Sequence, residues 1–129
     1  MNFEITKHTF YADIPEDVKF IFVSDLHECE VEPILDVISS TKPHALLIGG
    51  DLIHDATNYK NGFDFLTRAC ELCPTFVSLG NHERKYGENI GNEITKRGAL
   101  LLDDRSTSFK GIHIGGLSSC LSEKEVPDT

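Results

Sequence analysis

Three short apolar runs, each followed almost at once by glycine or by polar residues, constrain the fold of this chain more than any other feature. The runs are Phe20–Val23, Ala45–Ile48 and Thr75–Leu79. Their length and their β-branched and aromatic residues are typical of buried strands. The strings that follow them are Asp25-Leu26-His27, Gly49-Gly50-Asp51 and Gly80-Asn81-His82-Glu83. Because the carboxyl ends of parallel strands share one edge of a sheet, we expect the three strings to lie together.

Helical periodicity fills the intervals between the runs. The first interval has apolar residues at the i, i+3, i+4 and i+7 positions, namely Val31, Ile34, Leu35 and Ile38, with Pro33 tolerated in the first turn. The second has a stripe of Phe63, Leu66, Cys70 and Cys73 that stops at Pro74, and a shorter helix around Ile90 and Ile94 stops near Gly98. This βαβαβα order predicts an α/β fold with a parallel sheet.

The remaining segments predict smaller additions to this unit. Residues 99–102 read as a further strand, and residues 107–114 read as a hairpin that turns near Lys110-Gly111. Residues 3–11 alternate loosely and predict an outer strand. We treat residues 1–129 as a single domain, with residues 121–129 as a frayed tail.

Composition limits the classes of function. The formal net charge of −9 argues against a nucleic-acid groove, which needs clustered Lys and Arg. No apolar run approaches the roughly 20 residues that span a bilayer, and the N-terminus lacks the pattern of a signal peptide. We therefore expect a cytoplasmic protein that does not enter membranes.

The polar strings carry side chains suited to metal binding. In a strand, residues i and i+2 point the same way, so Asp25 and His27 could bind one metal while Leu26 turns into the core. A carboxylate with an imidazole suits Mn²⁺, Fe, Ni²⁺ or Zn²⁺ better than Ca²⁺. Taken singly, these residues also fit ordinary caps and turns. Their recurrence at three successive strand ends favours a metal site.

The strings resemble the D-x-H, G-D and G-N-H-[ED] blocks of the calcineurin-like metallophosphoesterase family. They occur in the same order and are separated by 26 and 30 residues. The resemblance runs from about Phe20 to Gly116. It implies a four-layer αββα sandwich, of which this chain carries the N-terminal portion, with the second sheet beginning near the hairpin.

The resemblance also implies a reaction, namely hydrolysis of a phosphoester substrate by a hydroxide held between two divalent metal ions. Mn²⁺ is the favoured metal, with Fe, Ni²⁺ and Zn²⁺ as alternatives. Asp25 and His27 would bind one ion, Asp51 would bridge both, and Asn81 would bind the second. His82 would be the catalytic residue that protonates the leaving oxygen. Where related phosphatases carry an aspartate that orients this histidine, the chain has His54, so Asp55 or Glu83 would have to replace it.

Two later histidine blocks of the family do not occur in these 129 residues. The chain could be the N-terminal part of a longer protein or a shortened member, or another chain could supply the missing ligands. We expect at most one well-occupied metal site and weak or absent activity for the chain alone. The alternative function is a catalytically inactive metal-binding or protein-interaction module. An incomplete second sheet would expose an apolar face and favour self-association.

Overall fold

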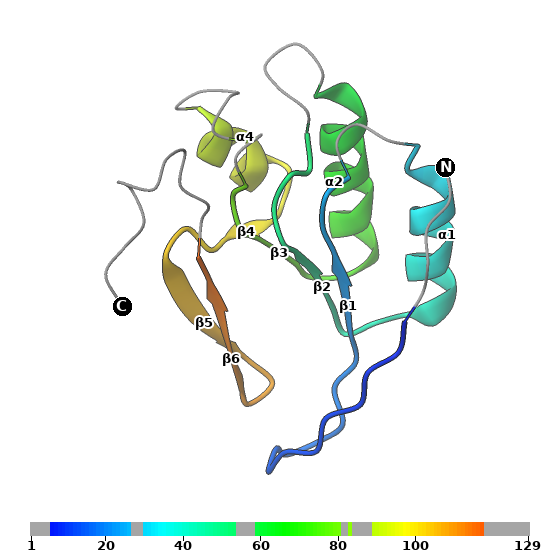
Figure 1. The fold of residues 1–129 in the computed structure, drawn as a ribbon, viewed down its shortest axis with the longest axis vertical. Coiled ribbons are helices and arrows are strands. Elements are labelled where there is room, and N and C mark those ends of the chain that lie inside the picture. Colours follow the sequence, from blue (N-terminus) through cyan, green and yellow to red (C-terminus); the bar gives the residue numbers. More distant parts are fainter. Residues whose placement is uncertain (1–5, 27–29, 54–58, 81–82, 84–88, 118–129) are drawn as a thin grey trace.

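The computed structural model describes residues 6–26, 30–53, 59–80, 83 and 89–117. Four parallel strands form one sheet in the order β1 (Phe20–Val23), β2 (Ala45–Ile48), β3 (Thr75–Val77) and β4 (Leu100–Leu101) (Figure 1). The helices between successive strands are α1 (Glu32–Thr41), α2 (Lys60–Leu72) and α4 (Ile90–Lys96). An antiparallel hairpin of β5 (Arg105–Phe109) and β6 (Ile112–Gly116) follows. The predicted βαβαβα unit and hairpin are confirmed.

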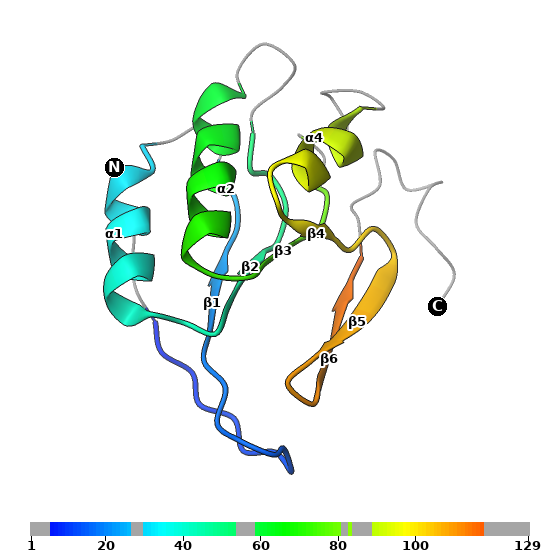
Figure 2. The same cartoon turned by 180° about the vertical axis from the view of Figure 1, so that it is seen from behind.

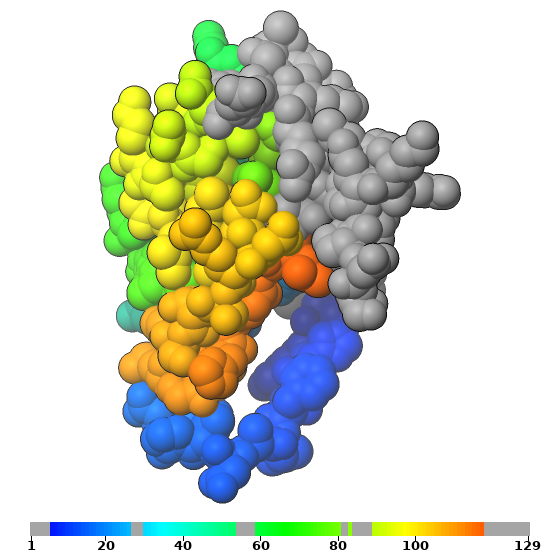
Figure 3. All heavy atoms as spheres, turned by 90° about the vertical axis from the view of Figure 1, so that its left-hand side faces the viewer, coloured from blue at the N-terminus to red at the C-terminus, as the bar shows by residue number. Residues whose placement is uncertain are grey.

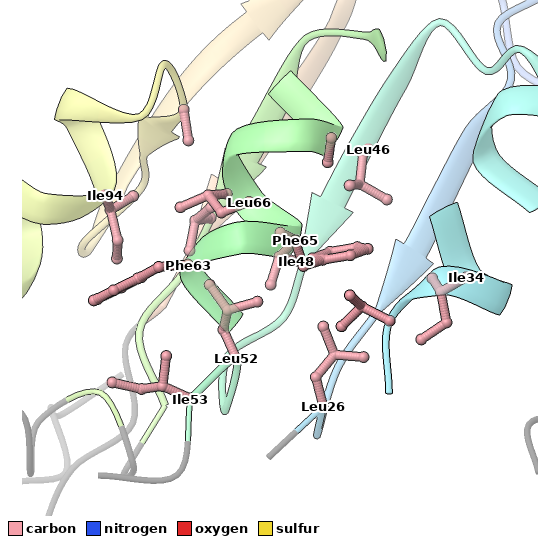
Figure 4. Packing of buried hydrophobic residues seen from close by; sticks show 14 of the residues in the cluster. Leu26, Ile34, Leu46, Ile48, Leu52, Ile53, Phe63, Phe65, Leu66 and Ile94 are labelled. Atoms are coloured by element: carbon pink, nitrogen blue, oxygen red, sulfur yellow. The ribbon is translucent and has the colours of Figure 1, made fainter. Parts of the chain in front are cut away.

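The three helices cover one face of the sheet, and the main core lies between them and the strands (Figure 2). Leu46, Ile48 and Val77 point into this core from the two central strands and are at most 2% exposed. Figure 4 shows how Leu46 and Ile48 meet the apolar side chains of the helices. The helix residues in this core include Ile34, Leu35, Ile38, Phe63, Phe65, Leu66, Ala69, Ile90 and Ile94.

The opposite face of the sheet is covered less completely. A smaller cluster there joins the sheet to the hairpin, and the ring of Phe109 lies 6.0 Å from that of Phe20 and 5.6 Å from that of Phe76. Phe22 projects from the same face and remains 65% exposed. A cleft of about 90 Å³ separates part of the sheet from β6. The hairpin therefore shields only part of this second face.

The N-terminal arm, residues 6–19, extends beyond the amino ends of the strands and turns back into β1 without forming a strand (Figure 1). The predicted outer strand is thus wrong for residues 6–11, since alternation gives a strand only where a sheet edge is there to pair with it. The arm reaches the hairpin turn through an ion pair of Glu16 with Lys110, at 3.2 Å. Figure 3 shows the opening that the arm and hairpin enclose. None of the helices in the described ranges is long and apolar enough to cross a membrane.

Candidate functional site

The loops that leave β1 and β2 bring two of the predicted ligands to the same edge of the sheet. Asp25 follows β1 and Asp51 follows β2, and the backbone N–H of Asp25 donates to the carbonyl oxygen of Gly50 at 3.2 Å. Both aspartates have left-handed backbone conformations, with φ of 57° and 54°. Since residues with a Cβ adopt this region only at a cost, the surrounding contacts must hold both loops in place.

The strand-based prediction for Asp25 needs a correction. β1 ends at Val23, so Asp25 lies in the loop, and its orientation is set by its left-handed backbone instead of by strand alternation. Leu26 is buried, at 4% exposed, as predicted. It belongs to the core beneath the helices (Figure 4). The buried Leu26 therefore anchors the loop that carries Asp25.

Two glycines allow the loops after β2 and β3 to touch. A Cβ on Gly50 would lie 2.9 Å from the backbone nitrogen of Gly80, and Gly50 has a φ of +100° that favours glycine. A Cβ on Gly80 would lie 2.5 Å from the backbone nitrogen of Asp51 and would overlap its carboxylate oxygen Oδ1. Gly50 thus brings the loop after β2 into close contact with the loop after β3.

Glu83 links these same two loops from the interior. Its side chain is fully buried, at 0% exposed. Oε1 accepts hydrogen bonds from the backbone N–H groups of Asp51 at 2.6 Å and Gly80 at 2.9 Å. Oε2 accepts a longer bond from the N–H of Ile53 at 3.4 Å. One carboxylate thus accepts from three backbone donors on both sides of the loop contact.

Burial raises the pKa of the Glu83 carboxyl above its ordinary value, because the charged form loses its hydration. The three backbone N–H donors act in the opposite direction, and the nearby charge of Asp51 adds to the increase. Desolvation is the largest of these influences. The three hydrogen bonds therefore offset the unfavourable burial of the charged Glu83 carboxylate.

Residues 18–121 match the calcineurin-like phosphoesterase family. This range contains all three polar strings, the parallel sheet, its helices and the hairpin. The chain belongs to the calcineurin-like phosphoesterase family. A search of curated proteins found no match. Membership gives the chain a phosphoesterase-type scaffold and confirms the resemblance that the three strings indicated.

Several predicted residues of this phosphoesterase scaffold lie outside the described residues: His27, Asn81, His82, His54 and Asp55. Of the predicted ligands, the structure therefore places Asp25 and Asp51 alone. His44 directly precedes β2 at the opposite edge of the sheet, where its Nδ1 accepts a hydrogen bond from the N–H of Lys19 at 2.9 Å. No cluster of three or more His, Cys, Asp or Glu that could hold a metal occurs within the described part of the chain.

Sequence reasoning considered Glu83 only as a support for His82 and missed its contacts with the backbone. The one signal was its place as the last residue of the third string, directly after the histidine. Glutamate is rarely buried unless it is paired, so residue type gave no reason to expect 0% exposure. Its described hydrogen bonds go to donors that are separated from it by 32, 30 and 3 residues in the sequence.

The described residues fit a divalent cation in their donor chemistry. Asp25 and Asp51 supply carboxylate oxygens from adjacent loops that a backbone hydrogen bond joins. The absence of a side chain at Gly80 lets the Asp51 carboxylate pack against the loop after β3, since a Cβ there would overlap Oδ1. Hard oxygen donors of this kind suit Mg²⁺ and Mn²⁺, and added imidazole shifts the preference toward transition metals.

A cavity of about 280 Å³ lies beside the first turns of α2. Among the described residues, its lining includes Phe63, Thr67 and Arg97 and none of the described members of the three strings. Arg97 stacks over the Phe63 ring, with 4.5 Å from Cζ to the ring centre, and donates to Thr67 Oγ1 at 3.0 Å. These contacts fasten the end of α4 to α2.

Proposed function

We propose that this chain carries the N-terminal half of a metal-dependent phosphoesterase site. The observation that supports it best is the joining of the Asp25 and Asp51 loops at the carboxyl edge of the sheet, within a chain of the calcineurin-like phosphoesterase family. A parallel α/β sheet binds its ligands at this edge. Asp25, His27, Asp51 and Asn81 would contribute ligands to two divalent-cation sites, with Mn²⁺ as the favoured metal. The site with Asp25, His27 and Asp51 would be the better occupied one in this chain.

When bound, two such cations activate water and neutralise phosphoryl charge. The chain's own part is to hold their ligands on loops fixed by the sheet. Asp51 occupies the central loop, between those that carry Asp25 and Asn81, and this place suits a carboxylate that serves both ions. His82 would donate a proton to the departing oxygen of the phosphoester.

Mn²⁺ titration by calorimetry tests this proposal. Asp51→Asn should weaken Mn²⁺ binding by at least about tenfold, and by more than Asn81→Ala does, because a bridging carboxylate serves both ions and the amide serves one. Asp36→Asn is a matched control, since Asp36 is an exposed carboxylate on α1. Equal losses in the Asp51 and Asn81 variants, or no loss at Asp51, would remove Asp51 from the bridging role.

Turnover of a generic phosphodiester and a generic phosphomonoester distinguishes the enzyme from the alternative module. We expect slow Mn²⁺-dependent hydrolysis that is lost in His82→Ala, which also excludes a contaminating enzyme. Mn²⁺ binding without any turnover would instead assign the chain to the inactive metal-binding class.

We also propose that copies of the chain associate through the partly covered face of the sheet. Support comes from Phe22, which is 65% exposed beside the apolar cleft. A large exposed aromatic next to other apolar surface favours contact with a second apolar surface.

A further inference from the structure

The full burial of Glu83 requires an explanation that the ligand set alone does not give. Burying a carboxylate is unfavourable unless hydrogen bonds replace its lost hydration. Here three backbone N–H groups do so, and the two shorter bonds, from Asp51 and Gly80, converge on the same oxygen. Each donor belongs to a loop that carries or precedes a proposed ligand. The hydrogen bonds that compensate for burial of the Glu83 carboxylate therefore lie at the junction of the two loops.

The geometry of these bonds links Glu83 to the position of the Asp51 carboxylate. The N–H of Asp51 is itself one of the three donors, at 2.6 Å, so Glu83 fixes the backbone from which that side chain projects. Asp51 has a φ of 54°, a conformation that needs such support. The bond from Gly80 fixes, in the same way, the backbone directly before Asn81.

We propose that Glu83 is a positioning residue that sets the placement of the Asp51 and Asn81 loops relative to each other, and thereby the affinity of the site for divalent metal. This inference rests on the proposed function, because it assumes that Asp51 binds metal. Glu83 acts through the backbone of Asp51 and Gly80. Residues that orient metal ligands in this way commonly affect metal affinity nearly as much as the ligands do.

Two uncharged variants of similar size separate the hydrogen-bonding role from charge and from packing. Glu83→Gln keeps an oxygen that can accept the bonds from Asp51 and Gly80, whereas Glu83→Met fills the space without an acceptor. We expect Glu83→Gln to bind Mn²⁺ within about threefold of the unmodified chain and Glu83→Met to bind at least about tenfold more weakly. The readout is free Mn²⁺ measured by electron paramagnetic resonance, well below the melting temperature, with folding checked by circular dichroism.

Ile38→Val is the control for loss of stability alone. Ile38 is 1% exposed and lies in the last turns of α1, toward the edge of the sheet opposite the site. It should lower the melting temperature and leave Mn²⁺ affinity unchanged. Equal affinities of the two Glu83 variants, whether both retained or both lost, would overturn the inference while leaving the proposed function intact. An unmodified chain that binds no Mn²⁺ would refute the proposed function and the inference with it.

Hydrogen exchange of the unmodified chain keeps the inference testable even if Glu83→Met does not fold. The amides of Asp51 and Gly80 should exchange as slowly as those in the centre of the sheet, and Glu83→Gln should preserve most of this protection. Fast exchange of both amides, with the β2 and β3 amides still protected, would overturn the inference.

Discussion

The two faces of the parallel sheet are built by neighbouring residues of the same strands, and they differ in how they are covered. Leu46 faces the helices and is fully buried, whereas Leu47, the next residue, faces the hairpin side and is only partly buried. On β1, Phe22 is 65% exposed on the hairpin side. The helix-covered face therefore contains most of the apolar burial, which is the main source of stability.

The loops of the site are anchored on the helix-covered side. Leu26 and Leu52 directly follow Asp25 and Asp51, and both lie in the core beneath the helices (Figure 4). Ile53, whose N–H donates to Glu83, lies in the same core. The comparison implies that changes in the part of the helix-covered core that holds Leu26, Leu52 and Ile53 should disturb both stability and metal binding. Changes on the hairpin side should leave the site largely unaffected.

The largest effect should come from two adjacent leucines. Leu46→Ala should lower the free energy of unfolding by about 2–5 kcal/mol, because it opens a cavity in a closed core. Leu47→Ala should cost about 1 kcal/mol, since its side chain is partly solvated and borders an existing cleft. Urea unfolding measures both. Equal losses would show that the hairpin side contributes as much stability as the helix side.

A pair of glycine substitutions should give an intermediate effect. A Cβ on Gly80 would meet backbone and carboxylate atoms of Asp51, so Gly80→Ala should cost about 1–3 kcal/mol and also weaken Mn²⁺ binding. A Cβ on Gly49 would meet the ring of Phe22, with 2.5 Å to Cζ. Because that ring is exposed and can turn aside, Gly49→Ala should cost less than about 1 kcal/mol.

Thermal unfolding and Mn²⁺ titration measure the stability and the metal affinity of Gly80→Ala and Gly49→Ala. Stronger loss of Mn²⁺ affinity in Gly49→Ala than in Gly80→Ala would contradict the assignment of the loop contact to the site.

The smallest effect on stability should come from Phe22→Ser. It should change the free energy of unfolding by less than about 1 kcal/mol, because the ring is mostly solvated. It should nevertheless reduce concentration-dependent association in sedimentation equilibrium, and Mn²⁺ affinity should stay the same. Association that is unaffected by Phe22→Ser and by Leu47→Ala would remove this face as the contact between copies.

Much of the architecture followed from patterns that the chain repeats. Strand-like runs, the helical stripe at Val31, Ile34, Leu35 and Ile38, and the hairpin turn at Lys110-Gly111 all predicted elements that the structure contains. These features depend on local periodicity and turn chemistry, which a sequence displays directly.

Features that depend on contacts between segments distant in the sequence could not be predicted from local patterns. The bonds of Glu83 join loops separated by about 30 residues, and its residue type points to the surface. The left-handed backbone of Asp25 and Asp51 is imposed by the loops that surround them. The continuous apolar run Phe20–Val23 identified Phe22 as a strand residue, but it could not show which face of the strand the helices would cover.

The hairpin has a consequence for the order in which the chain folds. β5 and β6 pair across a two-residue turn, whereas pairing β1 with β2 closes a loop of about 25 residues. The hairpin can therefore form on a microsecond timescale, before the parallel strands meet. An isolated two-stranded hairpin is only marginally stable, so it should form and dissolve repeatedly until Phe20 and Phe76 are in place to receive Phe109. The rate-limiting step of folding would then be assembly of the parallel sheet, and the hairpin would be stabilised only afterwards.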